Sequence, residues 1–337
     1  MPFQDIIGHS TQIEWLRRAI TSNRLAHGYL FVGDPAIGKG MTALRFIQAM
    51  NCESHTLPSP PDACGQCRTC LQIAARNHPD MLVIEPDESQ GQYPQIKIER
   101  IREIEHHVIY RPLFADKKIC LIDDADRLTI GAANALLKTL EEPPEHCLFI
   151  LITARPSALL STIKSRCLTI RFSPPHQTDA INYLMRHRTL SEPDARLLSL
   201  LTNARIGEAL SLDVEAAKNK QLEFFTLLFE QSDRSITDSL ASAETLTKSG
   251  QTSEALFWLW SGLRDLLLVA TQSSHDELLH QHQCSRLQKI VHTTSSQRIL
   301  DLLEELYDIE QGMQRNLNHQ LRFEQFFVHL QEAFQPV

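Results

Sequence analysis

A glycine-rich segment near the N-terminus has the residue spacing of a phosphate-binding loop. Gly33-Asp34-Pro35-Ala36-Ile37-Gly38-Lys39-Gly40 follows the pattern G-x-x-x-x-G-K. In such a loop the glycines let backbone N–H groups turn toward phosphate oxygens, and the lysine supplies a positive charge. The apolar run Tyr29–Val32 precedes the loop and a helical segment follows, which is the required strand–loop–helix context. The alternative is a strand-to-helix turn that binds nothing.

The residue after the lysine limits the chemistry of this loop. A serine or threonine hydroxyl normally holds Mg²⁺ at that position, and here it is Gly40. Thr42 comes two residues too late and lies on another side of the helix. Phosphoryl transfer depends heavily on the metal. The sequence therefore predicts a site that can still bind phosphate but hydrolyses poorly.

A second acidic motif ends another apolar run, at Ile122-Asp123-Asp124-Ala125-Asp126. Asp123 is placed to hold Mg²⁺ through water, which is the Walker B position. Asp124 stands where a glutamate commonly polarises the attacking water, and it is one methylene shorter. An acidic helix N-terminus, favoured by the helix dipole, explains the same residues equally well. Both interpretations stay open.

Four of the eight cysteines are close together in the sequence. Cys64-x2-Cys67-x2-Cys70, with Cys52 upstream, supplies four thiolates, enough for a closed tetrahedral zinc site with no place for a catalytic water. The alternatives are buried thiols or a zinc ribbon that binds nucleic acid. Few basic residues surround the cluster, so we expect structural zinc. The remaining cysteines are expected to be small core residues: Cys120, Cys147, Cys167 and Cys284.

Short apolar runs alternate with helical segments in the first half of the chain, which predicts a parallel sheet covered by helices on both faces. Ligands bind at the carboxyl ends of such strands, so the chemistry is expected just after Val32, Ile122 and Thr153. The predicted strands are Tyr29–Val32, Met81–Ile84, Ile119–Ile122, Leu148–Thr153 and Leu168–Phe172.

The second half has a different composition. Between Pro193 and Pro336 there is no proline, and leucine, glutamate, glutamine and alanine recur with helical spacing. We predict an α/β P-loop domain over 1–173 with an inserted zinc module at about 50–75, a small helical lid over 174–212, and an all-α C-terminal domain over 213–337.

Composition excludes several classes of protein. A formal net charge of −8 argues against coating nucleic acid by bulk electrostatics. The N-terminus lacks the pattern of a secretory signal, and the most apolar segment, Leu256–Ala270, is interrupted by Arg264 and Asp265 and is too short to span a bilayer. We expect a cytoplasmic protein without a membrane partner.

One string of residues carries a specific resemblance. Asn134-Ala135-Leu136-Leu137-Lys138-Thr139-Leu140-Glu141-Glu142-Pro143-Pro144 has the pattern of an amphipathic helix that stops before Pro143. Following a P-loop domain with a four-cysteine insertion, it resembles the signature of the AAA+ subunits of bacterial sliding-clamp loaders, which belong to the DNA polymerase III holoenzyme. The resemblance is close over residues 3–212.

The resemblance implies roles for two residues. Ser165-Arg166-Cys167 matches the motif whose arginine reaches into the ATP site of a neighbouring subunit, where it offers positive charge to the γ-phosphate. A surface arginine beside a strand is the alternative. Thr153 matches the sensor of the γ-phosphate, although a β-branched residue at a strand end has the same appearance.

The family's active ATPases also carry an arginine that senses ATP within the same subunit. Gly207 takes that place here, and Arg205 is displaced by two positions. The resemblance therefore implies a non-hydrolysing subunit that donates Arg166 in a hetero-pentamer with motor ATPase subunits and a clamp-opening subunit. Sliding clamp and primed DNA would be met through the complex, and its own ATP binding is doubtful. The rivals are an active motor-type ATPase and a zinc-ribbon DNA-binding protein.

Overall fold

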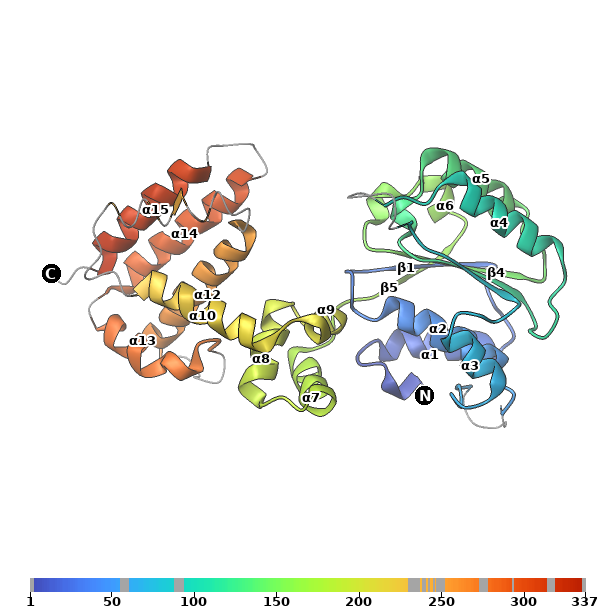
Figure 1. Cartoon of the computed structure of the whole chain (residues 1–337), viewed down its shortest axis with the longest axis horizontal. Coiled ribbons are helices and arrows are strands. Elements are labelled where there is room, and N and C mark those ends of the chain that lie inside the picture. The colour runs from blue at the N-terminus through green and yellow to red at the C-terminus, as the bar shows by residue number, and fades with distance from the viewer. Residues whose placement is uncertain are drawn as a thin grey trace. The chain divides into compact units, whose positions relative to one another are not determined.

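The chain forms two compact units in the computed structural model (Figure 1). The structure describes residues 3–54, 61–87, 94–229, 252–272, 278–292, 294–313 and 319–334, with isolated positions between 237 and 246. The first unit comprises Met1–Ser191 and Leu201–Ser211, and the second comprises Glu192–Leu200 and Leu212–Val337. The predicted division into three domains, with a separate lid over 174–212, stays a prediction.

The first unit is built on a sheet of five parallel strands in the order β2-β3-β4-β1-β5. Each strand begins and ends within one residue of its predicted run, so the parallel sheet is confirmed. All residues of β3 and β4 are buried, as expected for central strands covered on both faces. The strands are β1 Gly28–Val32, β2 Met81–Ile84, β3 Lys118–Ile122, β4 Cys147–Thr153 and β5 Leu168–Arg171.

Helices cover both faces of this sheet (Figure 1). One face carries α1 Ser10–Thr21, α2 Lys39–Asn51 and α3 Arg68–Ala74, and the other carries α4 Ile98–Ile109, α5 Ile130–Glu141 and α6 Ser161–Lys164. Alternation along β1 separates the two cores, because Tyr29 and Phe31 pack on one side and Leu30 on the other. The described part of the unit also contains α7 Gln177–Arg188, α9 Ile206–Ser211 and the 3-10 turns η1 Phe3–Asp5, η3 Ala125–Arg127 and η4 Pro156–Ala158.

A buried carboxylate fixes the loop between α4 and β3. Asp80 accepts the backbone N–H groups of Leu113, Phe114 and Ala115 at 2.8, 2.7 and 2.9 Å, and pairs with the buried Lys118 at 2.8 Å. Burial alone would raise its pKa, but the hydrogen bonds from Lys118 and the three N–H groups hold the pKa of Asp80 below its usual range. The loop is held while its Leu113 and Phe114 side chains stay 71 % and 76 % exposed.

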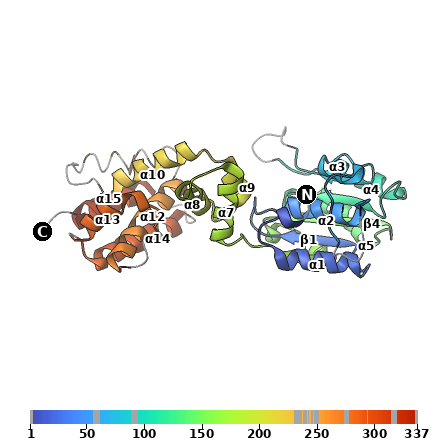
Figure 2. The same ribbon diagram turned by 90° about the horizontal axis from the view of Figure 1, so that it is seen from below.

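Every regular element described in the second unit is helical, as its composition predicted. Helix α12 packs against α10, α13 and α14, and α14 packs against α15 (Figure 2). Asp265, which interrupts the apolar segment, is fully buried and accepts hydrogen bonds from the backbone N–H and Nδ1 of His280 at 2.7 and 2.9 Å. The elements are α8 Glu192–Leu201, α10 Val214–Phe229, α12 Thr252–Ala270, η6 Gln281–Gln283, α13 Cys284–Val291, α14 Ser296–Met313 and α15 His319–Phe334.

Length and apolar content together rule out a bilayer-spanning helix among the residues that the structure describes.

Candidate functional site

A cleft of about 360 Å³ opens at the carboxyl ends of β1, β3 and β4, where the sheet topology predicts ligand binding. Its volume lies at the lower end of the range for small-molecule sites. The glycine-rich loop forms one wall and the acidic motif another, so the two motifs separated in sequence meet here as predicted. The lining residues are Asp5, Ile6, Ile7, Pro35, Ala36, Ile37, Gly38, Lys39, Gly40, Met41, Asp123, Asp124, Ile152, Tyr183, Ile206, Gly207 and Leu210.

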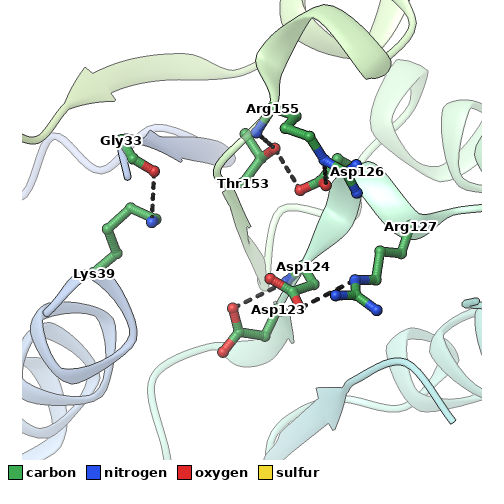
Figure 3. A network of polar contacts seen from close by, with 8 residues as sticks. All are labelled: Gly33, Lys39, Asp123, Asp124, Asp126, Arg127, Thr153 and Arg155. Atoms are coloured by element: carbon green, nitrogen blue, oxygen red, sulfur yellow. Dashed lines mark hydrogen bonds and ion pairs between the residues drawn. The ribbon is translucent and has the colours of Figure 1, made fainter. Parts of the chain in front are cut away.

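The loop lysine is turned back onto its own loop. Lys39 is buried, and its Nζ donates to the carbonyl oxygen of Gly33 at 2.7 Å (Figure 3). The same Nζ donates to the carbonyl oxygen of Asp34 at 2.5 Å. Burial lowers the pKa of Lys39, and the charge of Asp123 works in the opposite direction. A phosphate group would have to compete with these carbonyls for the ammonium.

Two further contacts set the shape of the loop. Gly38 begins α2 with φ +103°, a backbone conformation that favours glycine. The buried ring of His9 places Nε2 2.8 Å from the Ile37 carbonyl oxygen and packs edge-on against Phe172. Burial lowers the pKa of His9, which favours the neutral ring. No spacing pattern in the sequence singles out His9, because 28 residues separate it from its partner.

Asp123 faces the position of the missing hydroxyl. A Cβ atom at Gly40 would lie 3.6 Å from Asp123 Oδ2, an ordinary contact distance. Burial raises the pKa of Asp123, and its Oδ1 accepts the backbone N–H of Asp124 at 3.0 Å. Asp124 itself has φ +46° and pairs with Arg127 at 3.4 Å. Asp123 therefore lies beside the position at which a hydroxyl ligand would stand, whereas Asp124 is paired with Arg127.

The predicted sensor residue is engaged in a separate network. The hydroxyl of the fully buried Thr153 donates to Asp126 Oδ1 at 2.7 Å and accepts the backbone N–H of Arg155 at 3.0 Å. Arg155 Nε reaches the other carboxylate oxygen of Asp126 at 2.9 Å (Figure 3). Asp126 thus orders the end of β4, a role that its position in the acidic run did not reveal.

Helix α9 closes the cleft directly against the glycine-rich loop. The backbone N–H of Gly207 donates to the Ala36 carbonyl oxygen at 2.9 Å. A Cβ atom at Gly207 would come within 3.0 Å of that oxygen, so a side chain here would displace the loop. Arg205 pairs with Glu208 at 2.8 Å, and its Nε donates to the Thr202 carbonyl oxygen at 2.8 Å. Gly207, where the resemblance would place a cis arginine, thus makes a backbone contact with the loop, and Arg205 points to its own helix.

Introducing the side chains expected of an active ATPase should affect stability differently at Gly40 and at Gly207. We expect Gly40→Thr to fold with unchanged or slightly raised stability, because space is present and threonine exceeds glycine in helix propensity by a few tenths of a kcal/mol. We expect Gly207→Arg to lose about 1–3 kcal/mol, because its Cβ meets backbone that must shift. Urea unfolding of both variants measures the difference. Equal stability would contradict the Gly207–Ala36 contact.

Arg166 lies at the opposite end of the sheet from the cleft. It follows α6 and precedes β5, and its backbone carbonyl lies beside Gly28, the first residue of β1. The five residues of β1 span about 13 Å. This distance exceeds the length of an arginine side chain, so Arg166 cannot reach the cleft of its own chain. Cys167 is buried against Gly28, and burial raises the pKa of its thiol to about 11. The neighbouring guanidinium stays partly exposed, with 32 % of the side chain accessible.

The four clustered cysteines converge as predicted. Cys52 ends α2, Cys67 and Cys70 lie at the start of α3, and the four Sγ atoms all lie within 4.8 Å of one another. A tetrahedral zinc ion with 2.3 Å bonds requires sulfur separations of about 3.8 Å. Residues 55–60 of the predicted module lie outside the described residues.

Backbone N–H groups already point at the sulfur atoms. Cys64 Sγ accepts from the N–H of Gln66 at 3.4 Å and of Cys67 at 3.2 Å, and these bonds lower the pKa of Cys64 to about 6. Cys52 Sγ accepts from Cys64 N–H at 3.3 Å, whereas burial raises the pKa of Cys52 and of Cys70. The donor set fits a soft divalent metal, which would offset the repulsion among four thiolates.

The module is tied to the sheet domain from two sides. Asp62 accepts from Arg17 at 2.8 Å and from the backbone N–H of Phe3 at 2.9 Å. Gln48, buried in α2, donates to the Cys70 carbonyl oxygen at 2.6 Å. Loss of the module would therefore disturb α1 and α2 as well.

Comparison with known proteins agrees with these features. A family model described as DNA polymerase III, delta subunit, matches residues 8–176. The delta' subunit of DNA polymerase III from Bacillus subtilis (strain 168) is 29 % identical over 326 residues, 94 % of each chain. The tau subunit of the same strain is 37 % identical over 170 residues, 50 % of this chain and 29 % of tau. The chain thus spans nearly all of one relative and less than a third of the other.

A solved structure of a gamma-subunit-related protein from Thermotoga maritima aligns with a TM-score of 0.40 and 20 % identity, over 96 % of this chain and 100 % of that one. The family model covers half of the chain. The match to this family model shows that the chain belongs to the DNA polymerase III delta subunit family.

Proposed function

We propose that this chain is the delta' stator of a DNA polymerase III clamp loader, a subunit that hydrolyses no ATP and completes the ATP site of a neighbour with Arg166. Zinc and the helical second unit hold the shape of the subunit. The ring of loader subunits would then use ATP at other sites to open the sliding clamp and place it on primed DNA.

The position of Arg166 carries this proposal. Its guanidinium is partly exposed at the amino end of the sheet, whereas the cleft of the same chain lies at the carboxyl end. An arginine there can serve an ATP site only on another molecule. The anchoring of Cys167 against Gly28 fixes the backbone from which such a finger would reach.

The chain's own cleft supports the non-hydrolysing part. Gly40 supplies no hydroxyl to a metal, Lys39 is held by loop carbonyls, and Gly207 occupies the position of a cis arginine. Each change weakens a separate requirement of phosphoryl transfer: metal, phosphate positioning and charge stabilisation. Together they predict little or no turnover.

Exposed apolar side chains support membership of an assembly. Ile109, Tyr110, Leu113 and Phe114 are each at least 67 % exposed and lie within six consecutive residues. Asp80 holds part of this segment in place, which reduces the entropy lost when a partner binds. Clustered apolar exposure of this kind marks interaction surfaces.

An active motor-type ATPase is the second candidate. The 37 % identity with tau over 170 residues and the intact Gly38-Lys39 pair favour it. ATP hydrolysis by the purified chain, abolished by Lys39→Ala, would establish that candidate and overturn the stator.

Reconstitution tests the proposal. A loader assembled from motor and delta subunits with this chain should hydrolyse ATP and load a fluorescent clamp on primed DNA, and the same mixture without it should do neither. The chain alone should show no ATPase activity above a no-protein blank. Full clamp loading by the mixture that lacks this chain would contradict its proposed role in the complex.

A further inference from the structure

The arginine proposed as a finger is held by a carboxylate at the end of another helix. Arg166 Nη2 lies 2.8 Å from Glu141 Oε1, and Nη1 donates to the Thr162 carbonyl oxygen at 3.0 Å. Glu141 is the last residue of α5, 25 positions earlier in the sequence. Both terminal nitrogens of the guanidinium therefore have a fixed partner.

We infer that Glu141 is a positioning residue, which orients Arg166 toward the ATP site of the neighbouring subunit. The inference rests on the proposed function of Arg166. A guanidinium has five N–H donors in a planar fork, and the two contacts use one donor on each terminal nitrogen. The remaining donors lie in the same plane, so fixing that plane fixes where they point.

The strength of the contact suits such a role. Glu141 is 51 % and Arg166 32 % exposed at the side chain, so solvent screens the pair and it adds little to folding stability. It is strong enough to favour one side-chain orientation in the absence of a ligand. Charge-assisted hydrogen bonds to phosphate can then be added through the remaining donors.

The local structure supports orientation more than simple surface pairing. Cys167 fixes the backbone on one side of Arg166, and the Ser165 hydroxyl donates to the Thr162 carbonyl oxygen at 3.0 Å on the other. Because the backbone is held on both sides, the position of the Arg166 guanidinium depends mainly on the rotation of its side chain. A small misplacement of a group that acts on a transition state can cost about 100-fold in rate.

Five variants in the reconstituted loader, among them Arg166→Ala, test the inference by single-turnover, DNA-stimulated ATP hydrolysis at the site that this chain completes. Glu141→Ala should lower the hydrolysis rate at that site by about tenfold, within the range expected for a misplaced group. Glu141→Gln, which keeps a hydrogen-bond acceptor, should restore most of the rate. Glu142→Gln removes a neighbouring exposed acid and should resemble wild type. In an Arg166→Ala background, Glu141→Ala should have no further effect.

The outcomes separate this inference from the proposed function. If Arg166→Ala is inactive and Glu141→Ala retains the wild-type rate, Glu141 does not position the finger and the proposed function stands. An increased rate for Glu141→Ala would mean that the carboxylate restrains the arginine, which also overturns the inference. If Arg166→Ala itself retains full activity, the proposed function fails first. Additive losses in the double variant would indicate a merely structural role for Glu141.

Discussion

Replacing Arg166 by alanine should abolish hydrolysis at one ATP site of the reconstituted loader while leaving this chain folded. An arginine finger contributes about 10³- to 10⁵-fold to kcat in nucleotide hydrolysis, so we expect a loss of about 10³-fold at the site that this chain completes. The side chain is partly exposed and its ion pair is screened, so the free energy of unfolding should change by less than about 1 kcal/mol.

Single-turnover hydrolysis with the assembled complex measures this effect, because the burst should lose the ATP belonging to one site. Arg171→Ala is the matched control, since Arg171 is an exposed arginine at the other end of β5. Arg166→Lys should recover only part of the rate, because an ammonium keeps the charge and loses the planar fork. An unchanged burst with Arg166→Ala would exclude the finger.

Removal of zinc should have the largest effect on stability. Structural zinc sites bind with apparent free energies of about 10–16 kcal/mol, which become folding free energy when the apo site is disordered. We expect one zinc ion per chain by elemental analysis, and a strongly lowered Tm after chelation. The loss should extend beyond the module, since Asp62 and Gln48 connect it to α1 and α2.

A pair of cysteine variants checks the assignment. Cys64→Ser removes one of the four thiolates and should lower both zinc content and Tm. Cys284→Ser changes a half-buried cysteine of the second unit and should leave zinc content unchanged. Purified wild-type protein without zinc, or equal zinc content in the two variants, would contradict a zinc site at this cluster.

The features that the sequence predicted correctly are those encoded by short spacing. The five strands are buried apolar runs between turn signals, and burial on both faces makes such runs easy to recognise. The glycine-rich loop spans seven consecutive residues, Gly33 to Lys39, and three of the four cysteines recur every third position, with Cys52 lying 12 positions before Cys64. The glycine-rich loop and the acidic motif converge because parallel strands bring their carboxyl ends to one edge of the sheet.

The contacts that the sequence could not predict join residues far apart in the chain. Gly207 donates its N–H to Ala36, and Arg166 pairs with Glu141. Asp80 accepts N–H groups of residues more than 30 positions away. These depend on how helices pack and on which side-chain orientation is adopted, and neither leaves a periodic pattern. The absence of a hydroxyl at Gly40 could be predicted from the sequence, whereas the hydrogen bonds of Lys39 to its own loop could not.

DNA-stimulated ATPase activity of the reconstituted loader, with Lys39→Ala and Arg166→Ala introduced in this subunit alone, tests the central claim most directly. Lys39 is held by the carbonyl oxygens of its own loop, so Lys39→Ala should stay within about twofold of wild type, while Arg166→Ala should lose the share of the activity that belongs to the site it completes. If Lys39→Ala instead lowers the activity and Arg166→Ala leaves it unchanged, this chain hydrolyses ATP at its own site and is not a stator.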